Sequence, residues 1–64
     1  MRTELKVLRV KHGFTQKQVA DLLGISLVSY CNLERGKTFG SNRTWEKIKN
    51  LYKLSDKDMW KIQH

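Results

Sequence analysis

The sequence has no proline, a single cysteine, Cys31, and no long apolar run among its 64 residues. One cysteine can form neither an internal disulfide bond nor a zinc site built from several cysteines, and it is typical of a reducing cytoplasm. Roughly 18 consecutive apolar residues are needed to cross a bilayer, and neither such a run nor a signal peptide is present. We therefore expect a soluble cytoplasmic protein that has no membrane partner.

Residues that could carry catalysis or bind a metal are also scarce. The two histidines, His12 and His64, fall at an expected helix end and at the end of the chain. No paired carboxylates, nucleophile elbow or phosphate-binding loop accompany them, and no two candidate metal ligands have a recognised spacing. The sequence therefore argues against an enzyme, a metal site, a cofactor and a small-molecule ligand.

Basic side chains, in contrast, are abundant. Thirteen Lys and Arg residues against six Asp and Glu residues give a formal net charge of +7. Lys and Arg neutralise phosphates and release their counterions, so such an excess points to a polyanionic partner. The length fits one domain over residues 1–64, and 39% hydrophobic with 30% charged residues is a globular composition. We expect one small basic domain.

Start and stop signals predict helices throughout the chain and no strand. Thr3 is expected to cap the first helix, and Thr15 with Gln18 matches a capping box at the start of the second. Ser26 is expected to cap a third helix that runs to about Arg35. These signals predict an all-α fold.

Two further helices are expected in the second half of the chain. The fourth is expected to be capped by Ser41 or Asn42, and the fifth to begin with a capping box formed by Ser55 and Asp58. Aromatic residues at helical spacing are expected in the core, and not as exposed platforms for single-stranded nucleic acid. They are Tyr30, Trp45, Tyr52 and Trp60. Phe39 is expected to pack against Trp45, and the alternative, if the polyanionic partner is a nucleic-acid duplex, is that it inserts between bases in the minor groove.

The third helix has two unlike sides when its residues are placed at about 100° each. Tyr30 and Leu33 share one side and are expected to be buried. The opposite side is formed by Leu27, Val28, Cys31 and Asn32. An apolar pair on the outer side of a basic protein indicates that this side contacts a partner.

The second and third helices are separated by a very short turn. Only Gly24 and Ile25 lie between Leu23 and the Ser26 cap, so the two helices cannot lie antiparallel. A short turn containing glycine between steeply crossing helices is typical of a helix-turn-helix unit. The small side chain of Ala20 is expected to let these helices approach closely.

Five short motifs occur in order along the chain. They are Leu5-Lys6-Val7-Leu8-Arg9, Gly13-Phe14-Thr15-Gln16, Val19-Ala20, Leu23-Gly24-Ile25-Ser26 and Leu33-Glu34-Arg35-Gly36-Lys37. Together they resemble the phage repressor and Cro family, also called the Xre family, over about residues 4–60. The resemblance implies a compact five-helix, lambda-repressor-like helix-turn-helix domain in the cytoplasm of a prokaryotic or phage-infected cell.

The resemblance implies that the third helix (about residues 26–35) enters the major groove of DNA. It assigns contacts with base edges to Leu27, Val28 and Asn32. Asn32 can pair with adenine, whereas the two apolar residues can contact only thymine methyl groups. The family often has polar residues at these two positions, so this chain departs from the pattern. The alternative is that Leu27 or Val28 packs on a neighbouring helix.

The resemblance also implies residues that contact phosphate and residues that support the site. The implied phosphate contacts are Gln16, Lys17, Lys37, Asn42 and Arg43. Gln16 would also steady the base-contacting side chains, although it is alternatively a simple helix-start residue. Arg9 and Glu34 match positions that form a partly buried structural ion pair.

These expectations describe a sequence-specific regulator of transcription that binds double-stranded DNA. A Cro- or Xre-like repressor from a phage or mobile element would bind a pseudo-palindromic operator as a homodimer. The dimer contact is expected around residues Leu54 to Trp60, or at Val7 and Val10. The alternative is a protein-interaction module, or an accessory factor in excision or regulation, on the same fold.

Overall fold

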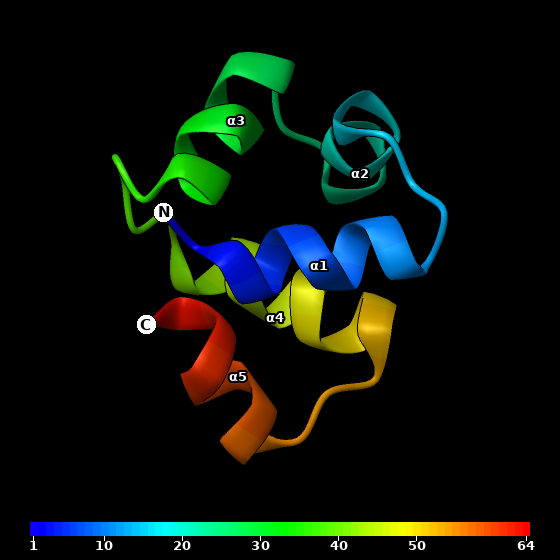
Figure 1. Ribbon diagram of the computed structural model, residues 1–64. Helices are drawn as coiled ribbons and strands as arrows, with labels where there is room; N and C mark the ends of the chain where they lie inside the picture. Colours follow the sequence, from blue (N-terminus) through cyan, green and yellow to red (C-terminus); the bar gives the residue numbers. More distant parts are fainter.

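The computed structural model describes residues 1–64 and contains five α-helices and no strand (Figure 1). The helices are α1 (Thr3–Lys11), α2 (Gln16–Leu23), α3 (Leu27–Arg35), α4 (Asn42–Tyr52) and α5 (Asp56–Gln63). In Figure 1, α1 crosses the middle of the molecule, with α2 and α3 above it and α5 below it. The all-α, five-helix prediction is confirmed. None of these helices has the length and apolar character that a membrane crossing requires.

Short polar side chains begin four of the helices. The Thr15 hydroxyl accepts a hydrogen bond from the Gln18 backbone amide at 3.1 Å, and the Gln18 side-chain Oε1 accepts one from the Thr15 backbone amide at 2.8 Å. This is the predicted capping box of α2. The hydroxyls of Ser26, Ser41 and Ser55 each accept from the amide three residues further on. Because these bonds are local, the sequence predicts them well.

Two helix starts differ from the prediction. Thr3 lies inside the first turn of α1, and the N-cap residue is Arg2, whose side chain makes no capping bond. At α5, the Ser55 hydroxyl accepts from the Asp58 backbone amide at 3.2 Å, but the Ser55 amide donates no bond to the Asp58 carboxylate, so the box is incomplete. Aspartate is one methylene shorter than the Glu or Gln of a capping box and does not reach back.

One hydrophobic cluster fills the space between the helices. Tyr30, Val19 and Ile48 contribute from α3, α2 and α4 and are completely buried. The remaining members are Leu5, Ala20, Leu23, Leu33, Trp45, Tyr52, Met59 and Ile62. Every helix therefore places at least one side chain in the core, and the core side of α3 is fixed by packing on its neighbours.

Trp60 is an exception to the predicted aromatic core. Its side chain is 64% exposed. Met59 and Ile62 define the buried side of α5, and a residue one position after Met59 points about 100° away from it. The prediction that Trp60 is buried is therefore wrong.

The link between α2 and α3 forms the expected tight turn. Gly24 ends α2 in the left-handed region with φ of 71°, and the Ile25 amide donates to the Ala20 carbonyl at 3.0 Å. Lys47 of α4 closes the same end by donating its ammonium to the Leu23 carbonyl at 3.0 Å. In Figure 1, α2 is seen nearly end-on while α3 is seen from the side, so the two helices cross steeply. Ala20 lies buried in this unit.

Candidate nucleic-acid interface

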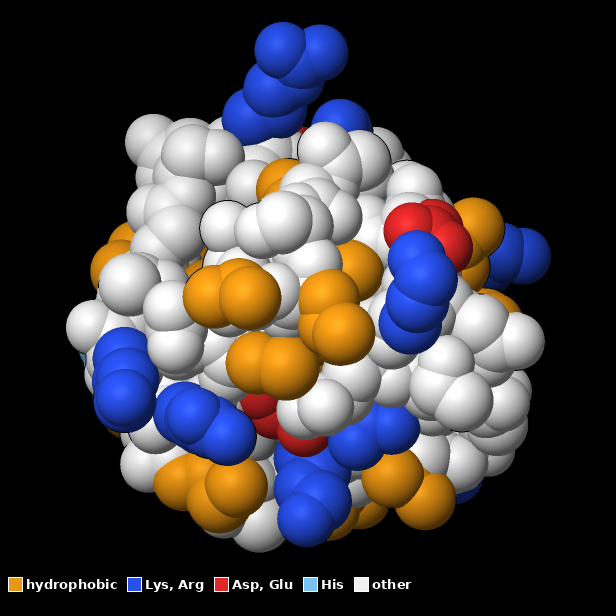
Figure 2. Space-filling model, turned by 90° about the horizontal axis from the view of Figure 1, so that it is seen from above, with side chains coloured by type: hydrophobic (Ala, Val, Ile, Leu, Met, Phe, Trp, Pro, Cys, Tyr) orange, Lys and Arg blue, Asp and Glu red, His pale blue; other side chains and the backbone are white.

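The outer side of α3 is open to solvent at its N-terminal end. Leu27 is 42% exposed and Val28 is 70% exposed, whereas Tyr30 and Leu33 on the inner side are buried. Figure 2 looks down on α2 and α3 and shows apolar side chains near the centre, with Lys and Arg side chains around them. Val28 is therefore largely free of packing within this chain, whereas somewhat more than half of Leu27 is covered.

Asn32 lies beside this apolar pair but is half-buried. It lines a groove of about 270 Å³ between α3 and the segment that leads into α4. The other residues of the groove are Ile25, Ser29, Leu33, Thr38, Gly40 and Thr44. The three hydroxyl-bearing residues of this groove were not singled out from the sequence, because nothing in their spacing brings residues 29, 38 and 44 together.

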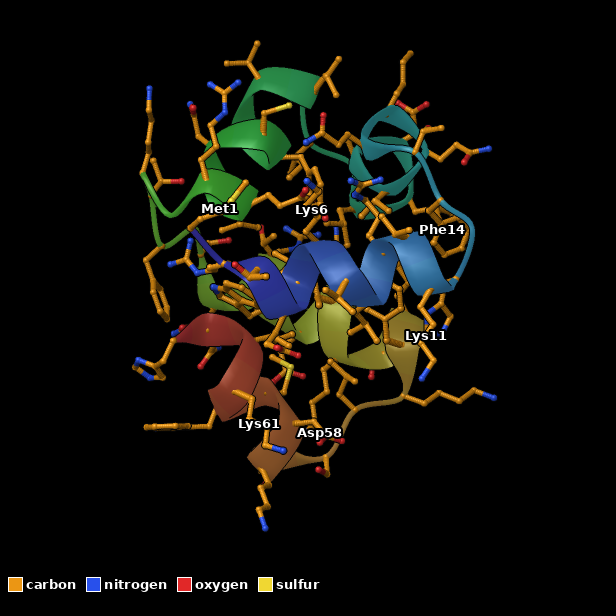
Figure 3. The ribbon with its side chains drawn as sticks, in the orientation of Figure 1. Met1, Lys6, Lys11, Phe14, Asp58 and Lys61 are labelled. Carbon is orange, nitrogen blue, oxygen red and sulfur yellow. The ribbon has the colours of Figure 1, made fainter.

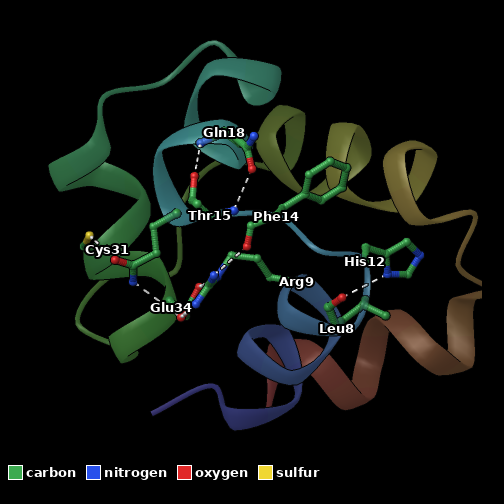
Figure 4. Close-up of polar contacts among 9 residues, drawn as sticks. Leu8, Arg9, His12, Phe14, Thr15, Gln18, Cys31 and Glu34 are labelled. Carbon is green, nitrogen blue, oxygen red and sulfur yellow. Dashed lines mark hydrogen bonds and ion pairs between the residues drawn. The ribbon is translucent and has the colours of Figure 1, made fainter.

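Gln16, the first residue of α2, connects α2 to α3 through its side-chain amide. Its Nε2 donates to Glu34 Oε1 at 3.5 Å, and its Oε1 accepts from the Cys31 thiol at 3.4 Å (Figure 4). Both partners lie on α3, but neither is one of the predicted base-contacting residues. Gln16 therefore steadies the helix itself and makes no hydrogen bond to Leu27, Val28 or Asn32.

Beneath α3, Arg9 and Glu34 form an ion pair with two hydrogen bonds. Arg9 Nε lies 3.0 Å from Glu34 Oε2 and Nη2 lies 3.3 Å from Oε1, while Nη1 donates to the Phe14 carbonyl at 2.8 Å (Figure 4). The side chains are 11% and 2% exposed. The hydrogen bond to Glu34 raises the pKa of Arg9. The pair joins α1 to α3 and, through Phe14, to the start of α2.

Two buried tyrosines lie near this ion pair. Neither the Tyr30 nor the Tyr52 hydroxyl makes a well-formed hydrogen bond, although the Tyr30 hydroxyl lies close to the Glu34 carboxylate. Burial raises the pKa of Tyr30, and its interaction with the Glu34 carboxylate and the negative charge of that group add to the effect. Burial also raises the pKa of Tyr52, against the opposing charge of Arg9. Both phenols are therefore held in the neutral form under this surface.

The predicted phosphate-contacting residues at the other end of α3 are exposed. Lys37 directly follows Gly36, which ends α3, and Asn42 and Arg43 are the first two residues of α4. None of the three ion pairs in the chain involves Lys37 or Arg43. Their charges are therefore free to meet an anion, and the N-terminus of α4 adds backbone amides that favour one.

Lys17 differs from these cations because it already has a partner. Its ammonium lies 3.3 Å from Asp21 Oδ1 within α2, and both side chains are largely exposed. An exposed pair of this kind contributes little, so a phosphate can replace Asp21 at low cost. Arg35, a further exposed cation in the last turn of α3, is not among the predicted contacts, because one more charge does not stand out among 13 Lys and Arg residues.

This arrangement of helices agrees with comparisons with known proteins. A family model described as a helix-turn-helix domain matches residues 1–59. The chain therefore belongs to the helix-turn-helix domain family. It is also similar to an uncharacterized HTH-type transcriptional regulator from Archaeoglobus fulgidus, with 31% identity over 68 residues that cover 94% of this chain and 97% of the relative. No solved structure matches the chain.

Proposed function

We propose that this protein regulates transcription by binding double-stranded DNA, with α3 in the major groove. The observation that carries the proposal is the exposed outer side of α3. Leu27 and Val28 are apolar and solvent-exposed there, although the inner side of the same helix is fully buried. A net charge of +7 supports a phosphate-rich partner. The relative from Archaeoglobus fulgidus is named as a transcriptional regulator, which supports the same function.

In this proposal the bases are contacted from the first two turns of α3. Leu27 and Val28 meet thymine methyl groups, and the Asn32 amide pairs with N6 and N7 of adenine. Apolar contacts discriminate less than paired hydrogen bonds do, so Asn32 supplies most of the sequence preference. We expect a preference for sites rich in thymine next to one fixed adenine.

Phosphate contacts on both sides of α3 would fix the position of the helix in the groove. We assign them to Gln16, Lys17, Lys37, Asn42 and Arg43. The first two lie at the start of α2, and the other three lie between the end of α3 and the first turn of α4. Contacts from two directions are expected to fix the register of α3 on the duplex without adding sequence information.

The motifs that resemble the Cro and Xre family support a finer proposal. We infer a repressor of a phage or mobile element that binds a pseudo-palindromic operator as a homodimer and excludes polymerase. Two copies of α3 would then enter successive major grooves, roughly 34–36 Å apart.

We place the contact between the two copies at a groove of about 290 Å³ between α1 and α5 (Figure 3). Glu4 and Lys11 lie seven positions apart along this groove on α1, with Val7 between them. A two-fold axis near Val7 would set Glu4 of one copy opposite Lys11 of the other, and the reverse. The exposed Trp60 on α5 is the alternative dimer surface.

Charge exchange tests this dimer contact. Glu4→Lys alone should weaken self-association in sedimentation equilibrium with operator DNA, and the double exchange Glu4→Lys with Lys11→Glu should restore it. A protein that stays monomeric on operator DNA contradicts the homodimer. A dimer that is lost on Trp60→Ala but indifferent to Glu4→Lys places the contact on α5.

Binding of fluorescent duplexes at several salt concentrations tests the function itself. Duplexes selected from random DNA should bind more tightly than scrambled ones. The logarithm of the affinity should fall with the logarithm of the salt concentration, with a slope of about −0.9 for each phosphate neutralised. No binding to any duplex at low salt would refute the proposal.

The exposed pair Leu27 and Val28 also favours a second candidate, a protein-interaction or accessory factor that uses the same side of α3. An apolar contact with a protein depends little on salt, whereas phosphate contacts depend on it steeply. The same titration therefore separates the two functions.

A further inference from the structure

Arg2, just before α1, connects three distant parts of the chain. Its Nη1 donates to the carbonyl oxygens of Leu33 at 2.6 Å and Thr38 at 2.7 Å, and its Nε donates to the carbonyl of Gln63 at 3.2 Å. Its backbone amide donates to the Glu34 carbonyl at 2.8 Å. One residue thus binds the end of α3, the segment after it and the end of α5.

Two aromatic rings lie against the same guanidinium group. Its central carbon lies 5.5 Å from the ring centroids of both Phe39 and Trp45. The rings lie 5.8 Å apart, and Trp45 Nε1 donates to the Phe39 carbonyl at 2.6 Å. The predicted packing of Phe39 on Trp45 is therefore confirmed, and Arg2 stacks against both rings at distances that favour cation–π attraction.

The segment from Gly36 to Ser41, between α3 and α4, has few other attachments. The amides of Gly36 and Lys37 bond back to α3, but those of Thr38, Phe39 and Gly40 make no backbone hydrogen bond. The bonds from Arg2 and Trp45 to carbonyl oxygens of this segment therefore hold it in place. The same segment carries Lys37 and sets where α4 begins.

We propose that Arg2 is a positioning residue for DNA binding. It holds residues 36–41 so that Lys37 and the N-terminus of α4 lie where the phosphates of a duplex meet them. The proposal rests on the proposed function, because it concerns residues assigned there to phosphate. Arg2 itself does not need to contact DNA, since its guanidinium is already occupied by carbonyl groups and aromatic rings.

Two substitutions distinguish the effect of the shape of the Arg2 side chain from the effect of its charge. Arg2→Lys keeps the positive charge, but one ammonium cannot reproduce the planar fork that serves several carbonyls at once. Arg2→Ala removes both. We expect both variants to bind the selected duplex about tenfold more weakly, with a salt slope reduced by about 0.9, the value of one phosphate contact. Wild-type affinity and slope in Arg2→Lys would overturn the proposal.

A control variant separates positioning from a general loss of stability. Ile48→Ala removes a fully buried core side chain from the second half of α4, at a position assigned neither to DNA nor to the dimer contact, and it should lower the melting temperature. Measured well below the melting temperature of every variant, Ile48→Ala should keep the wild-type salt slope. A reduced slope in Ile48→Ala equal to that in Arg2→Lys would show that stability alone explains the effect.

A double-mutant cycle with Lys37 provides the sharpest test. If Arg2 acts by placing Lys37, then Lys37→Ala should weaken DNA binding about tenfold in the wild type and much less in Arg2→Lys. Additive losses would overturn the proposal. If the wild type binds duplexes and Arg2→Lys binds equally well, only this inference fails. If the wild type binds no duplex at low salt, both the proposed function and this inference are wrong.

Discussion

The inner and outer sides of α3 lie in opposite environments, one in the core and one facing solvent. On the inner side, Tyr30 and Leu33 are buried, and Glu34 is held by Arg9 with two hydrogen bonds. On the outer side, Leu27 and Val28 are apolar and exposed. Both sides belong to one helix of 9 residues.

This contrast separates stability from recognition. A helix shorter than about 12 residues is marginal in isolation, so α3 owes its order to the inner side. Burial of each large apolar side chain there contributes about 1.5–3 kcal/mol. The outer side contributes less to folding, and in the proposed function its apolar residues meet DNA. Substitutions on the two sides should therefore change different measurements.

The largest expected effect lies on the inner side. Glu34→Ala should lower the free energy of unfolding by about 3–5 kcal/mol, because it leaves Arg9 buried without its partner. Urea unfolding followed by tryptophan fluorescence measures this loss. Replacement of both partners, Arg9→Met with Glu34→Leu, should recover much of it. A loss below about 1 kcal/mol in Glu34→Ala would show that the pair does not support α3.

Asn32→Ala on the outer side should have a smaller effect and a different readout. We expect specific DNA binding to weaken by about 1–3 kcal/mol, with little change on scrambled duplexes, because one base contact is lost. Competition between selected and scrambled duplexes measures the difference. Equal losses on both kinds of DNA would show that Asn32 does not contact bases.

Tyr30→Phe sharpens the comparison from the buried side. The Tyr30 hydroxyl makes no well-formed hydrogen bond and lies near the Glu34 carboxylate, so its removal should change the free energy of unfolding by less than about 1 kcal/mol at neutral pH. Because burial raises the pKa of Tyr30, the folded state holds its proton longer than the unfolded chain, in which a tyrosine titrates near about pH 10.

The sign of the pH effect follows from this difference. The contribution of Tyr30 to stability is complete below about pH 10 and is lost as pH rises toward the higher pKa of the folded state. Urea unfolding between about pH 8 and pH 11 should show stability falling less steeply in Tyr30→Phe than in the wild type. Identical slopes would contradict a buried, neutral phenol.

The smallest expected effect is that of Val28→Ala on stability. Because Val28 is 70% exposed, the free energy of unfolding should change by less than about 0.5 kcal/mol, while affinity for the selected duplex should fall. Thermal unfolding and duplex binding on the same preparation test both statements. A loss of stability above about 1 kcal/mol would show that Val28 packs within the chain.

Much of the fold was predictable because its signals are local. The capping box of Thr15 and Gln18, the Ser26 cap and the tight turn at Gly24 involve residues within a few positions of one another. The two sides of α3 follow from helical periodicity. The exposure of Trp60 was not predictable in this way, because a helix as short as α5 allows the periodicity to fit more than one buried side.

The candidate site was predictable only in part. Exposure of Leu27 and Val28 followed from the helical pattern, whereas the hydrogen bond between Gln16 and Cys31 did not. The role of Arg2 left no mark in the sequence, since its partners are backbone carbonyls up to 61 positions away. Every residue has a backbone carbonyl, so the residue types at positions 33, 38 and 63 do not indicate that Arg2 binds there.

The sequence by itself determined five helices, most of their caps, the steep turn between α2 and α3, and which side of α3 is apolar and outward. These features depend on backbone preferences and spacings of a few residues. Only the tertiary structure decided how Arg2 holds residues 36–41, how Gln16 meets Glu34, and that Trp60 lies outside the core. The contacts of Arg2 and Gln16 join groups distant in the chain, and the exposure of Trp60 depends on how α5 packs. All of them are fixed only after the helices have packed around a shared core.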